Sequence, residues 1–187
     1  RILTQQLAQG EQEADYLAAV LDELSRAENE ADLAEIRQEL ESGGYVRPTD
    51  RKKQPKLPQS KPMESVSSDG YRIFAGRNNR QNDLLSLKTA RKDDLWLHIQ
   101  KFHGTHVVIA CAGVRPPDQT VTEAAMLAAY FSQAKNGQNV PVDVTQVRNL
   151  RKPNGAKPGM VVYEQYRTVI VTPEPSLPER LKAKQEK

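Results

Sequence analysis

Cysteine and aromatic residues are scarce in this 187-residue chain. The single cysteine, Cys111, excludes an internal disulfide framework and any zinc site built from cysteines. Aromatic residues make up 5% and hydrophobic residues 37% of the chain, enough for a modest core in one domain with an appendage. No apolar run approaches the ~18 residues of a membrane-spanning helix, so we expect no membrane partner. The chain starts at Arg1 within a helical pattern, which indicates a fragment of a longer protein.

Charge is distributed unevenly along the chain. Residues 1–46 carry three basic and eleven acidic side chains, a net charge of −8. Residues 47–187 carry 24 basic and 13 acidic side chains, a net charge of +11. An acidic arm followed by a basic body indicates different partners for the two parts, and only the basic part suits phosphate.

The acidic arm, residues 1–46, has helical periodicity. A stripe of about three heptads predicts a helix over 1–27 that needs a partner helix. A second helix, capped by Asn29 or Asp32, is expected to end at Gly43-Gly44. We interpret the arm as the end of a coiled coil, with an ordinary helical bundle as the alternative. The stripe consists of Leu3, Leu7, Ala14, Leu17, Leu21 and Leu24, and it restarts at Leu33, Ile36 and Leu40.

Residues 47–62 form a basic linker rich in proline and lysine. Proline prevents a regular helix, and few apolar residues are present to anchor the segment. A solvated tether is the simpler interpretation, although such a tether also attracts a polyanion.

Residues 63–175 predict a compact α+β domain with a mostly antiparallel sheet and two main helices. The charged tail, 176–187, is expected to fray. Ser68-Asp69-Gly70 predicts a tight turn, and Thr120 with Glu123 fits a capping box. We expect strands at 63–67, 71–74, 95–98 and 107–111, a half-exposed strand at 140–144, a final hairpin of 160–163 with 168–171, and helices at 78–88 and 120–135.

A polar run from Arg77 to Asp83 lies between an expected strand and an expected helix. A helix N-terminus offers free amide groups and the positive end of the helix dipole, which suits phosphate. The basic residues add charge, and asparagine amides can bond to sugar or base edges. A capped helix start with surface polar residues explains the run equally well. The candidate RNA contacts are Arg77, Asn78, Asn79, Arg80 and Asn82.

The strand at 95–98 carries the only tryptophan of the chain. Asp94, Trp96 and His98 fall on one face of that strand, with Arg91 before it. Trp, His and Arg side chains can stack on unpaired bases. The alternatives are a core position for Trp96 and a structural pair in which Asp94 orients His98. Cys111 lies in an apolar run, which favours a core thiol.

Three histidines raise the question of a metal or an enzyme. His98, His103 and His106 match no zinc-binding spacing, so we expect no metal and no cofactor. An enzyme acting on RNA through Asp94, His98 and His106 is a further alternative, but no nucleophile completes it. We therefore expect a protein without catalytic activity.

Residues 148–157 form a basic loop without acidic residues. Pro153, Gly155, Pro158 and Gly159 predict a rigid, exposed loop. A strand follows the loop, where a P-loop requires a helix, so nucleotide hydrolysis is not expected. The loop favours contact with a polyanion, and a solvated hairpin is the alternative. Its basic residues are Arg148, Arg151, Lys152 and Lys157.

Together the motifs resemble the NFACT-R domain. The matching segments are "SSDGYRIFAGRNNRQNDLLSLKTARKDDLWLHIQKFHGTHVVI", "TEAAMLAAYFSQAK" and "KPNGAKPGMV", and "ENEADLAEIRQELESGGYV" resembles the end of the preceding coiled coil. The family includes bacterial RqcH, the fibronectin-binding-protein-A-like proteins and eukaryotic ribosome-associated quality-control factors. Gly104-Thr105-His106 stands where the family usually has Gly-Ser-His, which keeps the hydroxyl.

The resemblance implies a cytoplasmic protein that binds RNA. Its partners would be tRNA and the large ribosomal subunit, both rRNA and proteins, carrying a stalled peptidyl-tRNA. It would help hold tRNA for template-free C-terminal alanine tailing, and its arm would pair with an antiparallel helix outside this chain. By this resemblance the NFACT-N domain is expected to lie outside this chain, which is not expected to perform tailing by itself. The older family name suggests a fibronectin-binding surface adhesin as the alternative. The resemblance places Arg77, Asn78, Asn79, Arg80, Asn82, Arg91, Asp94, Trp96, His98 and His106 among the RNA-facing candidates.

Overall fold

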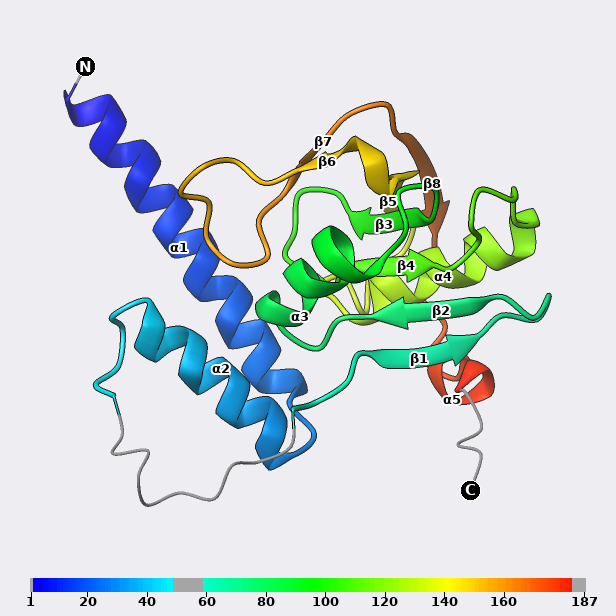
Figure 1. Ribbon diagram of the computed structural model, residues 1–187, viewed down its shortest axis with the longest axis horizontal. Helices are drawn as coiled ribbons and strands as arrows, with labels where there is room; N and C mark the ends of the chain where they lie inside the picture. The colour runs from blue at the N-terminus through cyan, green and yellow to red at the C-terminus, as the bar shows by residue number, and fades with distance from the viewer. Residues whose placement is uncertain (1, 49–58, 183–187) are drawn as a thin grey trace. The chain divides into compact units, whose positions relative to one another are not determined.

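The computed structural model describes residues 2–48 and 59–182, which divide into two compact units at Ser60 and Lys61 (Figure 1). The expected basic linker lies largely outside the described residues. Each unit has its own buried cluster of side chains.

The first unit is a pair of helices, α1 (Ile2–Arg26) and α2 (Glu30–Ser42). Asn29 caps α2, because its side chain accepts a hydrogen bond from the Asp32 amide at 2.9 Å. Tyr16 and Val20 of α1 pack with Ile36 of α2 in the buried cluster of this unit. The leucines of the stripe on α1 are exposed, with Leu3 at 75% and Leu21 at 67% of full exposure, whereas Ile36 of its second part is buried.

The second unit contains a six-stranded antiparallel sheet in the order β1-β2-β4-β3-β5-β8. Its first two strands form the expected hairpin, in which Met63 pairs with Ala75. Gly70 turns the chain there with a φ of 86°, a conformation that glycine adopts without steric cost. The strands are β1 (Met63–Val66), β2 (Arg72–Ala75), β3 (Leu95–Ile99), β4 (Val107–Ile109), β5 (Val140–Gln146) and β8 (Arg167–Val171).

Both faces of the sheet are covered. One face packs against α4 (Asp118–Tyr130) and α5 (Leu177–Leu181), and its side chains include Leu97 and Ile109. The opposite face carries Trp96 and Val108, because side chains alternate along a strand. That face is covered by α3 (Asn79–Leu84), the π-helix η2 (Leu85–Thr89), the short helix η3 (Val147–Asn149) and a two-stranded sheet of β6 (Leu150–Arg151) and β7 (Val162–Tyr163). The expected α+β fold with a mostly antiparallel sheet is confirmed.

The expected capping box at the start of α4 is wrong. The helix begins at Asp118 after Pro117, without a side-chain cap, and ends at Tyr130 instead of extending to 135. Thr120 lies inside the first turn, where its hydroxyl donates to Asp69 Oδ2 at 2.7 Å. Glu123 accepts a hydrogen bond from the Ser68 amide at 2.9 Å. Both polar side chains therefore tie α4 to the β1–β2 turn.

The expectation of a half-exposed strand at 140–144 is also wrong. Val142 and Val144 are buried on one face of β5, and Asp143 and Thr145 are buried on the other. Asp143 accepts hydrogen bonds from the hydroxyl of Tyr163 at 2.8 Å and from Thr168 at 2.7 Å. The small sheet covers the polar face, so alternation here marks two buried environments.

The expected pairing of 160–163 with 168–171 in a final hairpin is wrong. β7 pairs with β6, with Leu150 opposite Tyr163, whereas β8 pairs with β5 at the edge of the main sheet. The expected fraying of the tail is wrong for 177–181, because Leu177 and Leu181 of α5 are buried against the core. These two leucines, four residues apart, share one helix face.

Candidate nucleic-acid interface

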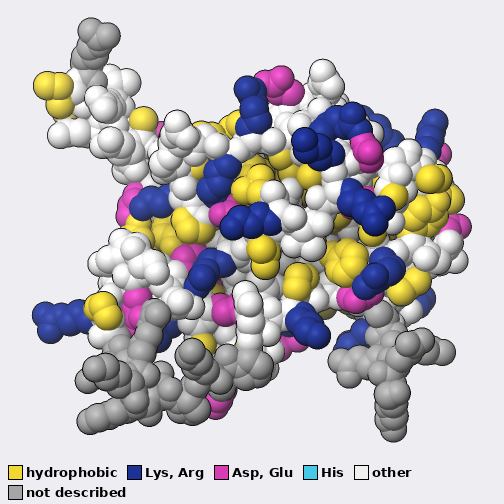
Figure 2. Space-filling view, in the orientation of Figure 1, with side chains coloured by type: hydrophobic (Ala, Val, Ile, Leu, Met, Phe, Trp, Pro, Cys, Tyr) yellow, Lys and Arg dark blue, Asp and Glu magenta, His cyan; other side chains and the backbone are white. Residues whose placement is uncertain are grey.

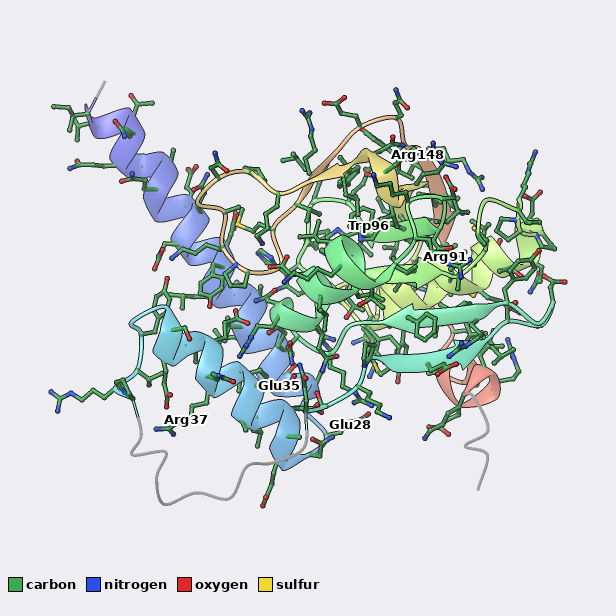
Figure 3. The ribbon with its side chains drawn as sticks, viewed as in Figure 1. Glu28, Glu35, Arg37, Arg91, Trp96 and Arg148 are labelled. Atoms are coloured by element: carbon green, nitrogen blue, oxygen red, sulfur yellow. The ribbon has the colours of Figure 1, made fainter. Side chains whose placement is uncertain are left out.

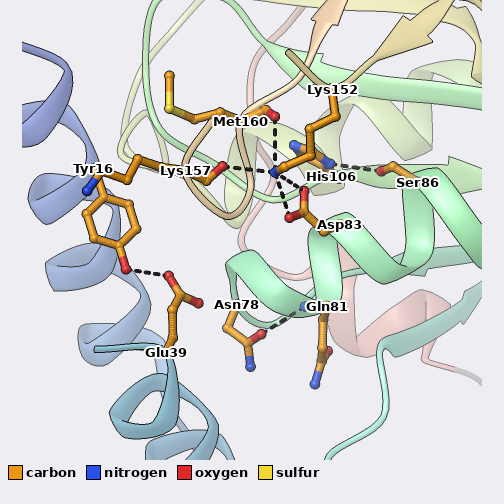
Figure 4. A network of polar contacts seen from close by, with 10 residues as sticks. All are labelled: Tyr16, Glu39, Asn78, Gln81, Asp83, Ser86, His106, Lys152, Lys157 and Met160. Carbon is orange, nitrogen blue, oxygen red and sulfur yellow. Dashed lines mark hydrogen bonds and ion pairs between the residues drawn. The ribbon is translucent and has the colours of Figure 1, made fainter. Parts of the chain in front are cut away.

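The start of α3 is built by side-chain caps. Asn78 accepts a hydrogen bond from the Gln81 amide at 2.9 Å (Figure 4), and Gln81 Oε1 accepts one from the Arg77 amide at 3.0 Å. Asn78 is almost completely buried. Its amide therefore serves the helix, as the capping interpretation predicts.

The other two candidate asparagines are buried as well. Asn82 Oδ1 accepts a hydrogen bond from the His106 amide at 3.1 Å, which joins α3 to the start of β4. Asn79 lies beneath Gly159, where an added Cβ would come within 2.8 Å of the Asn79 Cγ atom. We therefore leave Asn78, Asn79 and Asn82 out of the proposed contact surface.

Trp96 is a core residue, with no exposed surface. Its indole nitrogen donates to Ser86 Oγ at 3.0 Å, and the same hydroxyl lies 2.8 Å from His106 Nδ1. The Trp96 ring stacks on His98 with centroids 5.6 Å apart, and His106 meets both rings edge-on. A buried ring cannot stack on a base, so the core interpretation holds for Trp96, and His106 is buried as well.

Burial also determines the charge of the two histidines. It lowers the pKa of His98 to about 4, and nearby His103 lowers it further, against hydrogen bonds to the backbone of Ile99 and Gly104 that raise it. Burial likewise lowers the pKa of His106 well below its usual value, and His98 and Lys152 act in the same direction. Both rings are therefore neutral at pH 7 and contribute no charge to phosphate binding.

Asp94 organises a loop and does not orient His98. Its Oδ1 atom accepts hydrogen bonds from the Cys111 amide at 3.0 Å and the Ala112 amide at 2.9 Å. Its Oδ2 atom accepts one from the Arg91 amide at 2.8 Å. Among the described residues Asp94 makes no hydrogen bond to a histidine, which removes the expected structural pair and the acid–base arrangement with it.

The basic loop docks on α3. The Lys152 ammonium lies 2.7 Å from Asp83 Oδ2 and 2.9 Å from Oδ1 (Figure 4). Gly159 sits directly on Asn79 at the first turn of the same helix. Two segments about 70 residues apart in sequence thus form one surface, which we call the loop–helix surface: Arg77, Arg80 and residues 151–160.

The cations of the loop–helix surface differ in exposure and in their bonding partners. Arg80 is exposed, and its side chain makes no ion pair with any residue that the structure describes. Arg151 forms an ion pair with Glu164 on the surface. Exposed ion pairs contribute little to stability, so the Arg151 guanidinium can exchange Glu164 for a phosphate. The Arg77 guanidinium donates to the Lys61 carbonyl at 3.0 Å, and Lys157 is half-buried. Arg80 and Arg151 are the cations best placed for phosphate.

Arg91 lies before the start of β3, and Arg148 lies in η3 (Figure 3). The Arg148 amide donates to the Lys92 carbonyl at 3.0 Å, and its guanidinium pairs with Asp93. Lys88, Arg91 and Lys92 are exposed there, without an ion pair to any described residue. We call these three the strand-end cluster.

The structure thus splits the predicted site into a buried group and two cationic surfaces. Figure 2 shows Lys and Arg side chains spread over the face that carries α3 and the small sheet. Sequence reasoning missed Lys88 and Lys92, although both flank Arg91 in a stretch without acids before Asp93.

Residues 2–48 and 59–182 contain neither a candidate metal site nor a candidate membrane-spanning helix. No group of three or more histidine, cysteine or acidic side chains there is placed to hold a metal ion. No helix in that part of the chain is long and apolar enough to cross a membrane.

Comparison with known proteins identifies related families and structures. The NFACT protein RNA binding domain matches residues 61–165, and the NFACT N-terminal and middle domains match residues 1–59. The Rqc2 homolog RqcH of Bacillus subtilis is 43% identical over 175 residues, covering 92% of this chain and 30% of the relative. The Rqc2 homolog RqcH of Streptococcus pneumoniae (strain D39) is 44% identical over 161 residues, covering 85% of this chain and 28% of the relative.

A solved structure is similar to this chain. The C-terminal part of the fibronectin/fibrinogen-binding protein from Streptococcus suis covers 97% of this chain, and this chain spans 72% of that one. The two are 37% identical, with a TM-score of 0.89. This chain thus spans about 30% of the length of the RqcH relatives. It belongs to the NFACT family, and residues 61–165 are its NFACT-R RNA-binding domain.

Proposed function

We propose that this chain is the RNA-binding part of a ribosome-associated quality-control factor. The whole factor binds the large ribosomal subunit that carries a stalled peptidyl-tRNA, and this part helps hold tRNA for template-free C-terminal alanine tailing. The RqcH relatives and the NFACT-R match support this role. The coiled-coil end joins the domain to the remaining length of such a factor, and the factor acts in the cytoplasm.

One observation carries the RNA contact: the basic loop is tied to the start of α3. The ion pair between Lys152 and Asp83 holds the loop against α3, and Arg80 on the helix and Arg151 next to Lys152 are both exposed. Side-chain cations that replace the counterions of a nucleic acid give binding that weakens steeply with salt. The loop–helix surface is suited to phosphates, because its exposed charged groups are predominantly basic.

The same arrangement argues against catalysis by this part. His106 is buried, His98 is half-buried and stacks on Trp96, and Asp94 is engaged by three backbone amides. A general acid or base must reach a bound substrate. We therefore propose that the domain positions RNA and does not cleave it.

The test is fluorescence anisotropy with labelled tRNA at two salt concentrations, against duplex DNA of equal charge. We expect the double variant Arg80→Ala/Arg151→Ala to bind tRNA more weakly and to reduce the log–log salt slope by up to about two. Arg180→Ala is the matched control, because Arg180 pairs with Glu174 next to α5, away from the loop–helix surface. A double variant that behaves like the control would refute the assignment of this surface.

A fibronectin-binding adhesin is the second candidate, favoured by the similarity to the Streptococcus suis protein. Acidic extracellular proteins attract a basic domain weakly through charge. Binding of this chain to immobilised fibronectin that survives physiological salt would support the adhesin. Binding to large ribosomal subunits in a sedimentation assay, with loss of fibronectin binding at that salt, supports the quality-control role.

A further inference from the structure

We infer that Lys152 is a positioning residue, which shapes the basic loop from inside and leaves phosphate contact to its neighbours. This inference rests on the proposed RNA-binding function of the loop–helix surface. The sequence alone presents the four basic side chains of the loop as equivalent RNA contacts. The inference gives Lys152 a structural role instead.

The ammonium group of Lys152 has no donor left for a ligand. A lysine ammonium carries three N–H donors. Four acceptor atoms surround it: both carboxylate oxygens of Asp83, the Lys157 carbonyl at 2.9 Å and the Met160 carbonyl at 3.4 Å (Figure 4). The Lys152 side chain is 28% exposed. Its neighbour Arg151, the last residue of β6, is exposed instead and pairs with Glu164.

The loop is folded around this ammonium. It contains two tight turns, in which the Ala156 amide donates to the Pro153 carbonyl and the Met160 amide donates to the Lys157 carbonyl, both at 3.1 Å. The carbonyls at the two ends of the second turn, those of Lys157 and Met160, converge on the Lys152 ammonium. The cation therefore acts within the loop as a bound metal ion acts in a metal-binding loop.

Asp83 joins the folded loop to the helix. It stands on the last turn of α3 and binds the ammonium through both oxygens. Gly159, with a φ of 79°, rests on Asn79 one helical turn away. The loop position is thus set by one carboxylate and by close packing at a glycine.

This arrangement gives an acidic residue a favourable role in binding a polyanion. If Lys152 contacts phosphate directly, neutralising Asp83 removes a repulsive charge and frees the lysine, so RNA binding becomes tighter. If Lys152 positions the loop, neutralising Asp83 releases the loop and RNA binding becomes weaker. Lys152→Ala weakens binding in both cases, which makes Asp83 the informative residue.

The experiment compares Asp83→Asn with Glu164→Gln by tRNA anisotropy at fixed salt. Glu164 is the matched control, because it is the carboxylate partner of the adjacent Arg151 and its change alters net charge equally. We expect Asp83→Asn to raise the Kd for tRNA roughly three- to tenfold, because a loop that is released in the free variant must be ordered when RNA binds. We expect Glu164→Gln to bind as tightly as the unmodified chain or more tightly. An Asp83→Asn affinity equal to or above that of Glu164→Gln overturns the inference.

A readout without RNA separates this inference from the proposed function. Hydrogen exchange at the Met160 amide should accelerate in Asp83→Asn and stay unchanged in Glu164→Gln. If the unmodified chain fails to bind RNA, the proposed function falls, and the exchange rates still decide whether Lys152 positions the loop. Unchanged exchange in Asp83→Asn overturns the inference.

A second variant tests the position of the loop without changing its charge. Gly159→Ala leaves the charge unaltered but forces the loop away from Asn79, because the added Cβ has no space there. It should weaken tRNA binding in the same direction as Asp83→Asn. Near-ultraviolet circular dichroism of the buried Trp96 verifies that each variant keeps its core. A folded Gly159→Ala variant with unchanged affinity contradicts loop positioning.

Discussion

The indole nitrogen of Trp96 on β3 donates a hydrogen bond to the hydroxyl of Ser86 on η2, at 3.0 Å. The same hydroxyl lies 2.8 Å from His106 Nδ1 on the neighbouring part of the sheet. One small side chain therefore satisfies two buried rings and fastens the helical layer to the sheet beneath the proposed RNA surface.

Ser86→Ala should destabilise the domain by about 1–3 kcal/mol, because it leaves buried donors and acceptors without partners. Urea unfolding followed by tryptophan fluorescence measures this change. Ser176→Ala removes an exposed hydroxyl bonded to Glu174 and should stay within about 0.5 kcal/mol of the unmodified chain. Equal stability of the two variants would contradict the role of Ser86.

The buried histidines predict a loss of stability in mild acid. Their folded-state pKa values lie below the usual 6.5, near 4 for His98. Between these values the unfolded chain takes up protons that the folded chain does not, so stability falls as the pH drops below 6.5. The slope reaches at most about 1.4 kcal/mol per pH unit for each histidine.

Urea unfolding at pH 7.5, 6.0 and 5.0 tests this prediction above the range in which most carboxylates titrate. His98→Gln should flatten the dependence, because one of the two groups no longer titrates. A stability that is constant over this range in the unmodified chain would exclude buried neutral histidines.

The strand-end cluster predicts a second contact with RNA. Arg91→Ala/Lys92→Ala should weaken tRNA binding and reduce its salt dependence, because both side chains are exposed and without acidic partners among the described residues. Among the described residues the cluster shares no ion pair with Arg80 or Arg151, so the binding losses of the two double variants should add. If Arg91→Ala/Lys92→Ala binds tRNA as the unmodified chain does, RNA contacts one surface only.

Two threonines of α4 allow a matched comparison. Thr120 is buried and donates to Asp69, whereas Thr122 donates to the Asp118 carbonyl within its own helix. Thr120→Val should cost about 1–2 kcal/mol and loosen the β1–β2 turn, while Thr122→Val should have little effect. Thermal unfolding and hydrogen exchange at Gly70 provide the measurements. Similar effects of both variants would indicate a local helix contribution in place of the tertiary tie.

Strand positions were predictable from sequence, but some pairings were not. Alternation and turn residues are local, so the β1–β2 hairpin followed directly from Ser68-Asp69-Gly70. The partners of β7 and β8 depend on the path of the chain across the sheet, where Gln165 has a φ of 53°. No local pattern shows that β7 belongs to the second layer.

The candidate site shows the same limit for single residues. Arg80 and Arg151 lie on the surface as their basic surroundings suggested. Lys152 points inward, because Asp83, 69 positions earlier, receives it. Asn79 is buried because Gly159 packs on it. Both facts depend on contacts between distant segments, which periodicity and composition do not reveal.

The short helix α5 also protects a sheet edge. β1 is the outermost strand, and its free side would otherwise offer unpaired backbone groups to another molecule. Ser65 of β1 forms a bridge with Lys182, just after α5, while Leu177 and Leu181 are buried against the core. The last described residues thus cover part of this edge, so we expect cleavage before Leu177 to expose the edge of β1 and to favour aggregation.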